Sequence, residues 1–269
     1  MAIDFNGRVA IVTGAGGGLG RAHALALAAR GAKVVVNDLG GARDGSGHSL
    51  TAAEAVVAEI RAAGGLAIAN GASVTDWDAV HAMVQQAVDT WGRVDILVNN
   101  AGILRDKSFA KMDLADFRLV MDVHLMGAVH CAKAVWPHMQ AQNYGRILMT
   151  TSSSGLYGNF GQSNYSAAKL ALVGLMQTLA IEGAKHGIRV NSLAPTAATR
   201  CRRCSTRPSF TRALRRRTRC GGSRASSRAR RTSGMASPWA VLRPPGRQRV
   251  RPSRTAPRPL APCRSTRPC

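Results

Sequence analysis

The sequence predicts an α/β protein built on a doubly wound parallel sheet, with a layer of helices on each face. Two observations carry this prediction. Short β-branched runs alternate with longer Ala- and Leu-rich segments along the first 200 or so residues. Runs such as 34–36 (Val-Val-Val) and 96–98 (Ile-Leu-Val) are apolar without alternation, which is typical of parallel strands covered on both faces.

The expected elements follow one another in regular order. Right-handed crossovers between successive strands would place the helices on both faces of the sheet, giving three layers, α/β/α. Strands are expected at residues 9–13, 33–37, 66–70, 95–99, 146–151 and 189–193. Helices are expected at residues 21–30, 50–63, 76–91, 113–140 and 164–186.

Charge divides the chain near Arg200. The formal net charge is +23, yet the residues up to Arg200 hold 17 basic and 14 acidic side chains, whereas the remainder holds 20 Arg and no acid. Residues 201–269 also lack Lys, His, Asn, Ile and Tyr, and such a composition cannot bury enough apolar surface to offset chain entropy. We expect a folded domain over residues 1–200 and a disordered Arg- and Pro-rich tail over residues 201–269.

Two interpretations of this tail are open. The absent Lys, Asn, Ile and Tyr have A/T-rich codons, so a reading-frame shift near Arg200 of a GC-rich gene would produce it. The alternative is a nucleic-acid-binding arm, because many Arg side chains could neutralise phosphates; the lack of Lys and the scarcity of aromatic residues disfavour nucleic acid as a partner. Cys201 and Cys204 have no second pair or His at ligand spacing, so we expect no metal site.

Targeting and redox features favour the cytoplasm. A strand-like run begins within ten residues of the N-terminus, without the basic and apolar regions of a signal peptide. No apolar stretch approaches the roughly 20 residues that span a bilayer. Only Cys131 lies in the expected folded domain, which fits a reducing compartment. We therefore expect a cytoplasmic protein that does not enter a membrane.

A glycine-rich turn at residues 13–20 (TGAGGGLG) links the first expected strand to the first helix. Such a turn lets the backbone approach a pyrophosphate, and the helix N-terminus offers N–H groups and a positive dipole end. Asp38 follows the second strand, 18 positions after Gly20, where a carboxylate can accept hydrogen bonds from ribose hydroxyls and would repel a 2′-phosphate. These features predict the Rossmann fold with NAD rather than NADP as cofactor; the alternative is a loop Asp that caps the next segment.

Tyr165 and Lys169 stand four positions apart, and therefore on one face of the expected helix 164–186. Taken alone, the pair is common on an amphipathic helix. A free phenol, with a pKa near ~10, is a poor base at neutral pH, but a nearby ammonium and a positive nicotinamide ring would favour the phenolate. Tyr165 could then take the hydroxyl proton of an alcohol. The serines at residues 152–154 could bind the substrate oxygen, and chemistry alone does not choose among them.

In this order the motifs resemble the short-chain dehydrogenase/reductase family. The glycine pattern, the run 99–102 (Asn-Asn-Ala-Gly) and Tyr165-x-x-x-Lys169 all stand in family order. The family's serine lies thirteen residues before its Tyr, so the resemblance implies catalysis by Ser152, Tyr165 and Lys169, with Ser152 and Tyr165 binding substrate. His124 stands where the family has a relay Asn behind the Lys; it is either a relay member or a packed core residue.

The resemblance also implies the residues that contact NAD. Ala72 replaces an Asp that usually meets the adenine, which implies weaker NAD binding. The remaining expected contacts lie at the carboxyl ends of the strands and on the catalytic helix: Thr13, Gly14, Gly18, Leu19, Gly20, Asp38, Ser73, Val74, Asn100, Ala101, Gly102, Tyr165, Lys169, Pro195, Thr196 and Thr199.

Four segments narrow the resemblance to one branch of the family. Residues 37–41 (NDLGG), 99–107 (NNAGILRDK), 123–125 (VHL) and 158–165 (GNFGQSNY) are similar to the dehydrogenase domain of peroxisomal multifunctional enzymes of type 2 and its bacterial single-domain relatives. This implies NAD-dependent oxidation of a secondary alcohol to a ketone, with a small-molecule substrate of the 3-hydroxyacyl-CoA or hydroxysteroid type, in lipid metabolism. It also implies a homodimer or homotetramer. The alternative is a catalytically impaired Rossmann domain whose basic tail binds nucleic acid.

Overall fold

The computed structural model describes residues 3–42, 44–195 and 239–242. These form a seven-stranded sheet in the order β3-β2-β1-β4-β5-β6-β7. The strand order reverses between β1 and β4, the switch point at which sheets of this kind bind ligands. The first six strands run parallel, as the sequence predicts: β1 (Val9–Thr13), β2 (Lys33–Asn37), β3 (Ala67–Asn70), β4 (Ile96–Asn99), β5 (Gly145–Thr150) and β6 (Ile188–Pro195).

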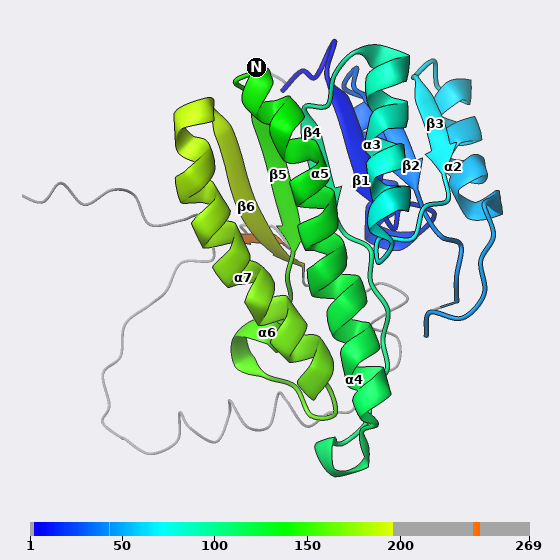
Figure 1. The fold of residues 1–269 in the computed structure, drawn as a ribbon. Coiled ribbons are helices and arrows are strands. Elements are labelled where there is room, and N and C mark those ends of the chain that lie inside the picture. Colours follow the sequence, from blue (N-terminus) through cyan, green and yellow to red (C-terminus); the bar gives the residue numbers. More distant parts are fainter. Residues whose placement is uncertain (1–2, 43, 196–238, 243–269) are drawn as a thin grey trace, which may run out of the picture.

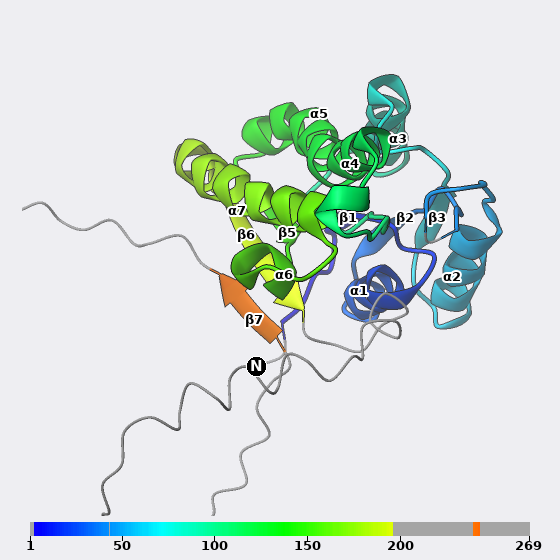
Figure 2. The ribbon, with the colours of Figure 1, turned by 90° about the horizontal axis from the view of Figure 1, so that it is seen from below.

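Helices cover both faces of the sheet, so the predicted three layers are confirmed. On one face lie α1 (Gly18–Ala28) and α2 (Thr51–Ala62). Figure 2 shows the other face covered by α3 (Trp77–Trp91), α5 (Gly127–Ala141) and α7 (Ser163–Gly183). In Figure 1, α4 (Leu114–Met121) and the short α6 (Ser153–Tyr157) lie below the sheet edge at which the strands end.

The central strand β1 contributes to two separate cores. Val9 and Ile11 are fully buried against the layer that contains α3, α5 and α7. Ala10 and Val12 are fully buried against α1 and α2. Because successive side chains of a strand point to opposite faces, a run without polar residues is what a strand with both faces covered requires.

A polar cluster lies at the opposite, N-terminal edge of the sheet. The Asp95 carboxylate is fully buried and accepts hydrogen bonds from Nη1 of Arg8 at 2.8 Å, Nη2 of Arg93 at 2.6 Å and the N–H of Val9 at 3.0 Å. The guanidinium of Arg8 also lies 3.8 Å from the ring centroid of Tyr144, just before β5. This cluster ties the starts of β1, β4 and β5 together.

The predicted long helix 113–140 is interrupted. Residues Asp122–Met126 form one π-helical turn between α4 and α5. π turns inside α-helices are frequent at functional sites, and this one carries His124. The sequence also did not predict α6, because its five residues are too few to show a helical period.

The strand β7 (Trp239–Leu242) was not expected, because it lies in the stretch predicted to be a disordered tail. It pairs antiparallel with β6, Trp239 opposite Pro195. Trp, Val and Leu suit a strand, and the edge of β6 offers unpaired backbone groups. A run of four residues between Arg-rich segments is too short to reveal a period of two. The rest of the predicted tail, with Cys201 and Cys204, lies outside the described residues.

The stretch Ser163–His186, which comprises α7 and its last turn, is long and apolar enough by composition to cross a membrane, with a mean hydropathy of 1.2. A core helix of a globular protein passes the same test. Leu172 and Met176 of α7 are buried in the core beside α5. The helix therefore owes its apolar character at least in part to packing against the sheet.

Candidate active site

The glycine-rich turn lies at the carboxyl end of β1, where the strand order reverses. Gly14 and Gly18 have φ angles of +61° and +55°, a backbone region that favours glycine. A Cβ atom on Gly14 would lie 2.8 Å from Cα of Ala101, and one on Gly20 would overlap the carbonyl oxygen of Gly14. The turn therefore has the close packing of backbone on backbone that a pyrophosphate site uses.

Two of the predicted cofactor residues hold this turn in shape. Oγ1 of Thr13 accepts hydrogen bonds from the N–H groups of Asn100 at 3.0 Å and Ala101 at 3.1 Å. Nδ2 of Asn100 donates in return to the carbonyl oxygens of Thr13 and Gly14, at 2.9 and 3.0 Å. These side chains bind the turn itself and position its backbone.

Asp38 faces the glycine turn from the end of β2. Its Oδ2 accepts a 2.7 Å hydrogen bond from the N–H of Gly16, and its Oδ1 accepts one of 2.7 Å from the N–H of Gly40. A carboxylate has about four acceptor sites, so two such bonds leave room for ribose hydroxyls. The N-cap of α1, Gly17, makes no side-chain capping bond, and Gly18 and Leu19 begin that helix. The residues therefore fit an adenosine diphosphate group.

The predicted contacts on the other strands lie along the same edge. Val74 is buried and packs against Gly127, while the Oγ atoms of Ser73 and Thr75 lie 2.8 Å apart. Pro195 ends β6. The predicted contacts Thr196 and Thr199 lie outside the described residues.

Lys169 reaches the same edge from α7. Its side chain is 3% exposed, and Nζ donates a 2.6 Å hydrogen bond to the carbonyl oxygen of Thr150, at the end of β5. Nζ lies 5.6 Å from the centroid of the Tyr165 ring. Thr151 fixes the helix, because its Oγ1 donates to the carbonyl oxygen of Lys169 at 2.6 Å. The predicted pair is thus brought together at the end of β5.

His124 joins this pair from the π turn. Its ring lies edge-on to Tyr165, with the ring centroids 5.1 Å apart and the planes at 90°. Its Nε2 lies 2.8 Å from the carbonyl oxygen and 3.2 Å from the backbone nitrogen of Ile103. Burial, together with the positive charge of Lys169, holds the pKa of His124 well below its usual range. The imidazole is therefore neutral at pH 7.

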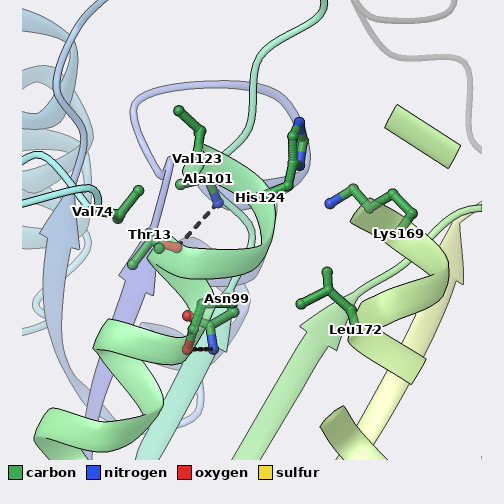
Figure 3. Close-up of a pocket in the computed structure, with 10 residues that line it drawn as sticks. Thr13, Val74, Asn99, Ala101, Val123, His124, Lys169 and Leu172 are labelled. Atoms are coloured by element: carbon green, nitrogen blue, oxygen red, sulfur yellow. Dashed lines mark hydrogen bonds between the residues drawn. The ribbon is translucent and has the colours of Figure 1, made fainter. Parts of the chain in front are cut away.

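His124 and Lys169 both line a small cavity. Figure 3 shows the amine of Lys169 reaching toward the ring of His124. The cavity has room for about one water molecule. Among the described residues, Nδ1 of His124 has no hydrogen-bond partner. Gly102 leaves room for this ring, since a Cβ atom there would overlap it.

Ser152 lies at the start of α6, just after β5. Its Oγ accepts a 3.2 Å hydrogen bond from the N–H of Ser154 and so caps the helix. Gly155 of α6 packs against α7, where a Cβ atom would lie 2.9 Å from Cβ of Lys169. Ser152 therefore precedes a helix that is packed on α7.

Sequence reasoning missed the residues that brace the start of α7. Asn164 is fully buried; its Nδ2 donates to the carbonyl oxygen of Arg105 at 3.1 Å, and its Oδ1 accepts from the N–H of Tyr165 at 2.7 Å. Nε2 of Gln162 donates to Asp106 at 2.8 Å. These bonds join the segments 99–107 and 158–165, which carry the resemblance to one branch of the family. The sequence shows both segments but not that they meet.

Comparison with known proteins bears on this site. Residues 8–203 match the short chain dehydrogenase family. The peroxisomal multifunctional enzyme type 2 of Mus musculus is 58% identical over 198 residues, 74% of this chain and 26% of that protein. A Mycobacterium tuberculosis protein described as a short-chain type dehydrogenase/reductase is 58% identical over 193 residues, 72% of this chain and 68% of that protein.

A solved structure agrees with this match. The 7α-hydroxysteroid dehydrogenase in complex with NADH and 7-oxoglycochenodeoxycholic acid superposes with a TM-score of 0.70, at 33% identity over 78% of this chain and 79% of that one. The chain spans less than half the length of the peroxisomal relatives it matches, 22% to 45% of them.

Proposed function

The chain belongs to the short-chain dehydrogenase family, and from that premise we propose that it oxidises a secondary alcohol to a ketone with NAD as hydride acceptor. The observation that carries the proposal is the meeting of Tyr165, Lys169 and His124 at the switch point, beside the glycine turn. The structure of one relative supports a nicotinamide dinucleotide as the cofactor, since it was solved with NADH.

Each residue has a chemical task in this proposal. The backbone of the glycine turn would hold the pyrophosphate, and Asp38 would accept hydrogen bonds from the adenosine ribose. The cofactor, when bound, supplies the site that takes the hydride. Ser152 would hold the substrate oxygen, and Tyr165 would take the hydroxyl proton. The ammonium of Lys169 would favour the phenolate form of Tyr165, because a nearby opposite charge favours the charged form of a group.

We further propose that His124 positions a water molecule behind Lys169. Its Nε2 is bound to Ile103, Nδ1 has no hydrogen-bond partner among the described residues, and the residue lines a cavity together with Lys169. A neutral imidazole has one N–H donor and one acceptor nitrogen, so one nitrogen can bind Ile103 and the other can bind a water molecule. His124 is thus a positioning residue of the relay, not a group that carries charge.

The variant His124→Phe keeps a ring of similar size and removes both nitrogens. We expect kcat to fall about tenfold, less than a whole general base contributes, while the Kd for NADH stays unchanged. Steady-state kinetics and NADH fluorescence titration measure the two. His81→Phe, which alters an exposed His beside Trp77, is the matched control. An unchanged kcat in His124→Phe would assign this residue to the core instead.

The choice between NAD and NADP depends on Asp38. Its carboxylate would repel a 2′-phosphate while accepting from a ribose hydroxyl. In Asp38→Asn we expect the preference for NADH over NADPH to fall about tenfold or more, the scale of one hydrogen bond to a charged group. Fluorescence titration with both cofactors measures it. Asp113→Asn, which alters an exposed N-cap of α4, should keep the wild-type ratio; a wild-type ratio in Asp38→Asn would refute the assignment.

We propose a 3-hydroxyacyl-CoA or a hydroxysteroid as the substrate class. The support is the identity of 57% to 58% with proteins named peroxisomal multifunctional enzymes and a hydratase-dehydrogenase-epimerase, together with the likeness to a hydroxysteroid dehydrogenase. NADH formation by the purified chain with (R)-3-hydroxyacyl-CoA or a hydroxysteroid tests the proposal. Binding of NADH without turnover of either class would favour a catalytically impaired Rossmann domain.

Three further expectations stay proposals. We propose a homodimer or homotetramer, since Leu170 and Ile181 leave apolar surface of α7 exposed at 52% and 77%. We propose a cytoplasmic location, although several relatives are named as peroxisomal enzymes. The division into a domain, 1–200, and a tail, 201–269, is supported by the end of the family match at residue 203.

A further inference from the structure

The described residues between β2 and α2, 39–42 and 44–49, form a narrow hairpin-like loop, which we name the strap. Its two legs bind each other: the N–H of Ser49 donates to the carbonyl oxygen of Leu39 at 2.9 Å, and the N–H of Ala42 donates to that of Ser46 at 2.7 Å. At its base, Gly40 donates to Asp38 at 2.7 Å. The strap is therefore a compact unit anchored on the expected ribose-binding carboxylate.

The tip of the strap reaches the segment that follows β4. Nε of Arg105 donates a 2.9 Å hydrogen bond to the carbonyl oxygen of Asp44. Gly45 packs on Ile103, and a Cβ atom added there would lie 3.3 Å from the Ile103 side chain. In the sheet, β1 lies between β2 and β4. The strap thus bridges from the end of β2 to the segment after β4, and the carboxyl end of β1, with its glycine turn, lies between these two strands in the sheet.

Arg105 is itself held from the catalytic side. Its Nη1 donates to Oδ1 of Asp116 on α4 at 2.6 Å, and its carbonyl oxygen accepts from Asn164, the neighbour of Tyr165. Lys107 pairs with the other oxygen of the same carboxylate at 3.3 Å. One Arg side chain therefore connects the strap to the segment that supports the catalytic helix.

We propose that the strap closes over the bound dinucleotide and that Arg105 is the positioning residue that keeps it closed. This inference rests on the proposed use of NAD. In this proposal the cofactor crosses the end of β1 beneath the contact of Arg105 with Asp44, so the contact has to break when the cofactor leaves. Releasing the strap should then speed dissociation of the cofactor before it alters the chemistry.

The experiment measures dissociation of NADH from the full chain by stopped-flow fluorescence, with displacement by excess NAD. In Arg105→Met we expect the dissociation rate to rise about five- to tenfold, the worth of one hydrogen bond, and the Kd to rise in proportion. In Gly45→Ala we expect a change in the same direction, because the added methyl group crowds Ile103 and the φ of +90° strains an L side chain. This second variant keeps the test open if Arg105→Met does not fold.

The matched control is Lys107→Met. It removes one positive partner of Asp116, as Arg105→Met does, and leaves the strap contact intact. We expect its dissociation rate to equal that of the wild type. A wild-type rate in both Arg105→Met and Gly45→Ala, or an equal rise in Lys107→Met, would overturn the strap alone. A wild-type chain that binds no NADH would overturn the proposed function, and the strap with it.

Discussion

Replacing Tyr165 with phenylalanine is expected to lower kcat by about 10³-fold, within the range that general acid–base groups contribute, and to leave the Kd for NADH at its wild-type value. The substitution removes one oxygen atom and keeps the ring that stands edge-on to His124. Packing is therefore retained, and the group that would accept the alcohol proton is lost. Initial rates of NADH formation and a fluorescence titration on the same preparation measure the two effects.

The matched control is Tyr144→Phe. That phenol lies beside the N-terminal end of β5, where its ring stacks on Arg8 and Arg146, so the variant removes the same atom far from the site. We expect wild-type kcat from it. A Tyr165→Phe enzyme that keeps more than about a tenth of the wild-type kcat would contradict the assignment of Tyr165 as the base.

The second large effect is on stability. In Asp95→Asn we expect the free energy of unfolding to fall by about 3 kcal/mol, the lower end of the cost of breaking a buried ion pair. The lower end applies because the side chains of Arg8 and Arg93 are 34% and 38% exposed, so water can solvate them once the carboxylate is gone. The shift of the urea midpoint, at an unchanged m value, measures the loss.

The stability that Asp95→Asn loses should depend on pH, and the direction of that dependence follows from the pKa of Asp95. Burial by itself would raise the pKa of Asp95, but hydrogen bonds from Arg93, the N–H of Val9 and Arg8 outweigh burial and lower it. A carboxyl with a lowered pKa stabilises the fold fully above its unfolded-state value, about 3.9 for Asp. The contribution disappears as the pH falls through the folded-state pKa. The difference between wild type and Asp95→Asn should therefore be constant near neutrality and shrink below about pH 4.

Asp89→Asn is the control for this series. Asp89 is an exposed residue of α3 that accepts a 2.7 Å hydrogen bond from Gln85, four positions earlier, and such pairs on a helix surface contribute at most about 0.5 kcal/mol. We expect its urea midpoint to stay close to that of the wild type at every pH. An Asp95→Asn variant as stable as Asp89→Asn would show that the cluster at the strand starts does not hold the sheet together.

The strands were predictable because their signal is local. The runs that became β1 and β2 contain four and three successive buried apolar residues, and their bounds agree with the prediction at both ends. The π turn was not predictable, since Asp122–Met126 continues the composition of the helices on either side. The strand β7 was missed for the opposite reason: four apolar residues carry too little pattern within an Arg- and Pro-rich stretch.

In the candidate site, too, the local features were predictable from the sequence and the contacts between distant segments were not. Tyr165 and Lys169 are linked by helix geometry, so their spacing alone places them on one face. The bond from Gln162 to Asp106 and the bond from Arg105 to Asp44 join residues 56 and 61 positions apart. Loops that meet through such side-chain bonds leave no periodic trace in the sequence. The structure therefore adds the supports of the site rather than its reacting groups.

The Asp95 cluster and the Tyr165 site stand at opposite ends of the same strands. Strand β5, six residues long, separates them by about 20 Å at ~3.3 Å per residue. Substitutions more than about 10 Å apart with no shared partner act independently. Substitutions at the carboxyl end of the strands can thus alter substrate choice while the Asp95 cluster at the other end still stabilises the fold. Substitutions that change the function of such a chain therefore need not lower its free energy of unfolding.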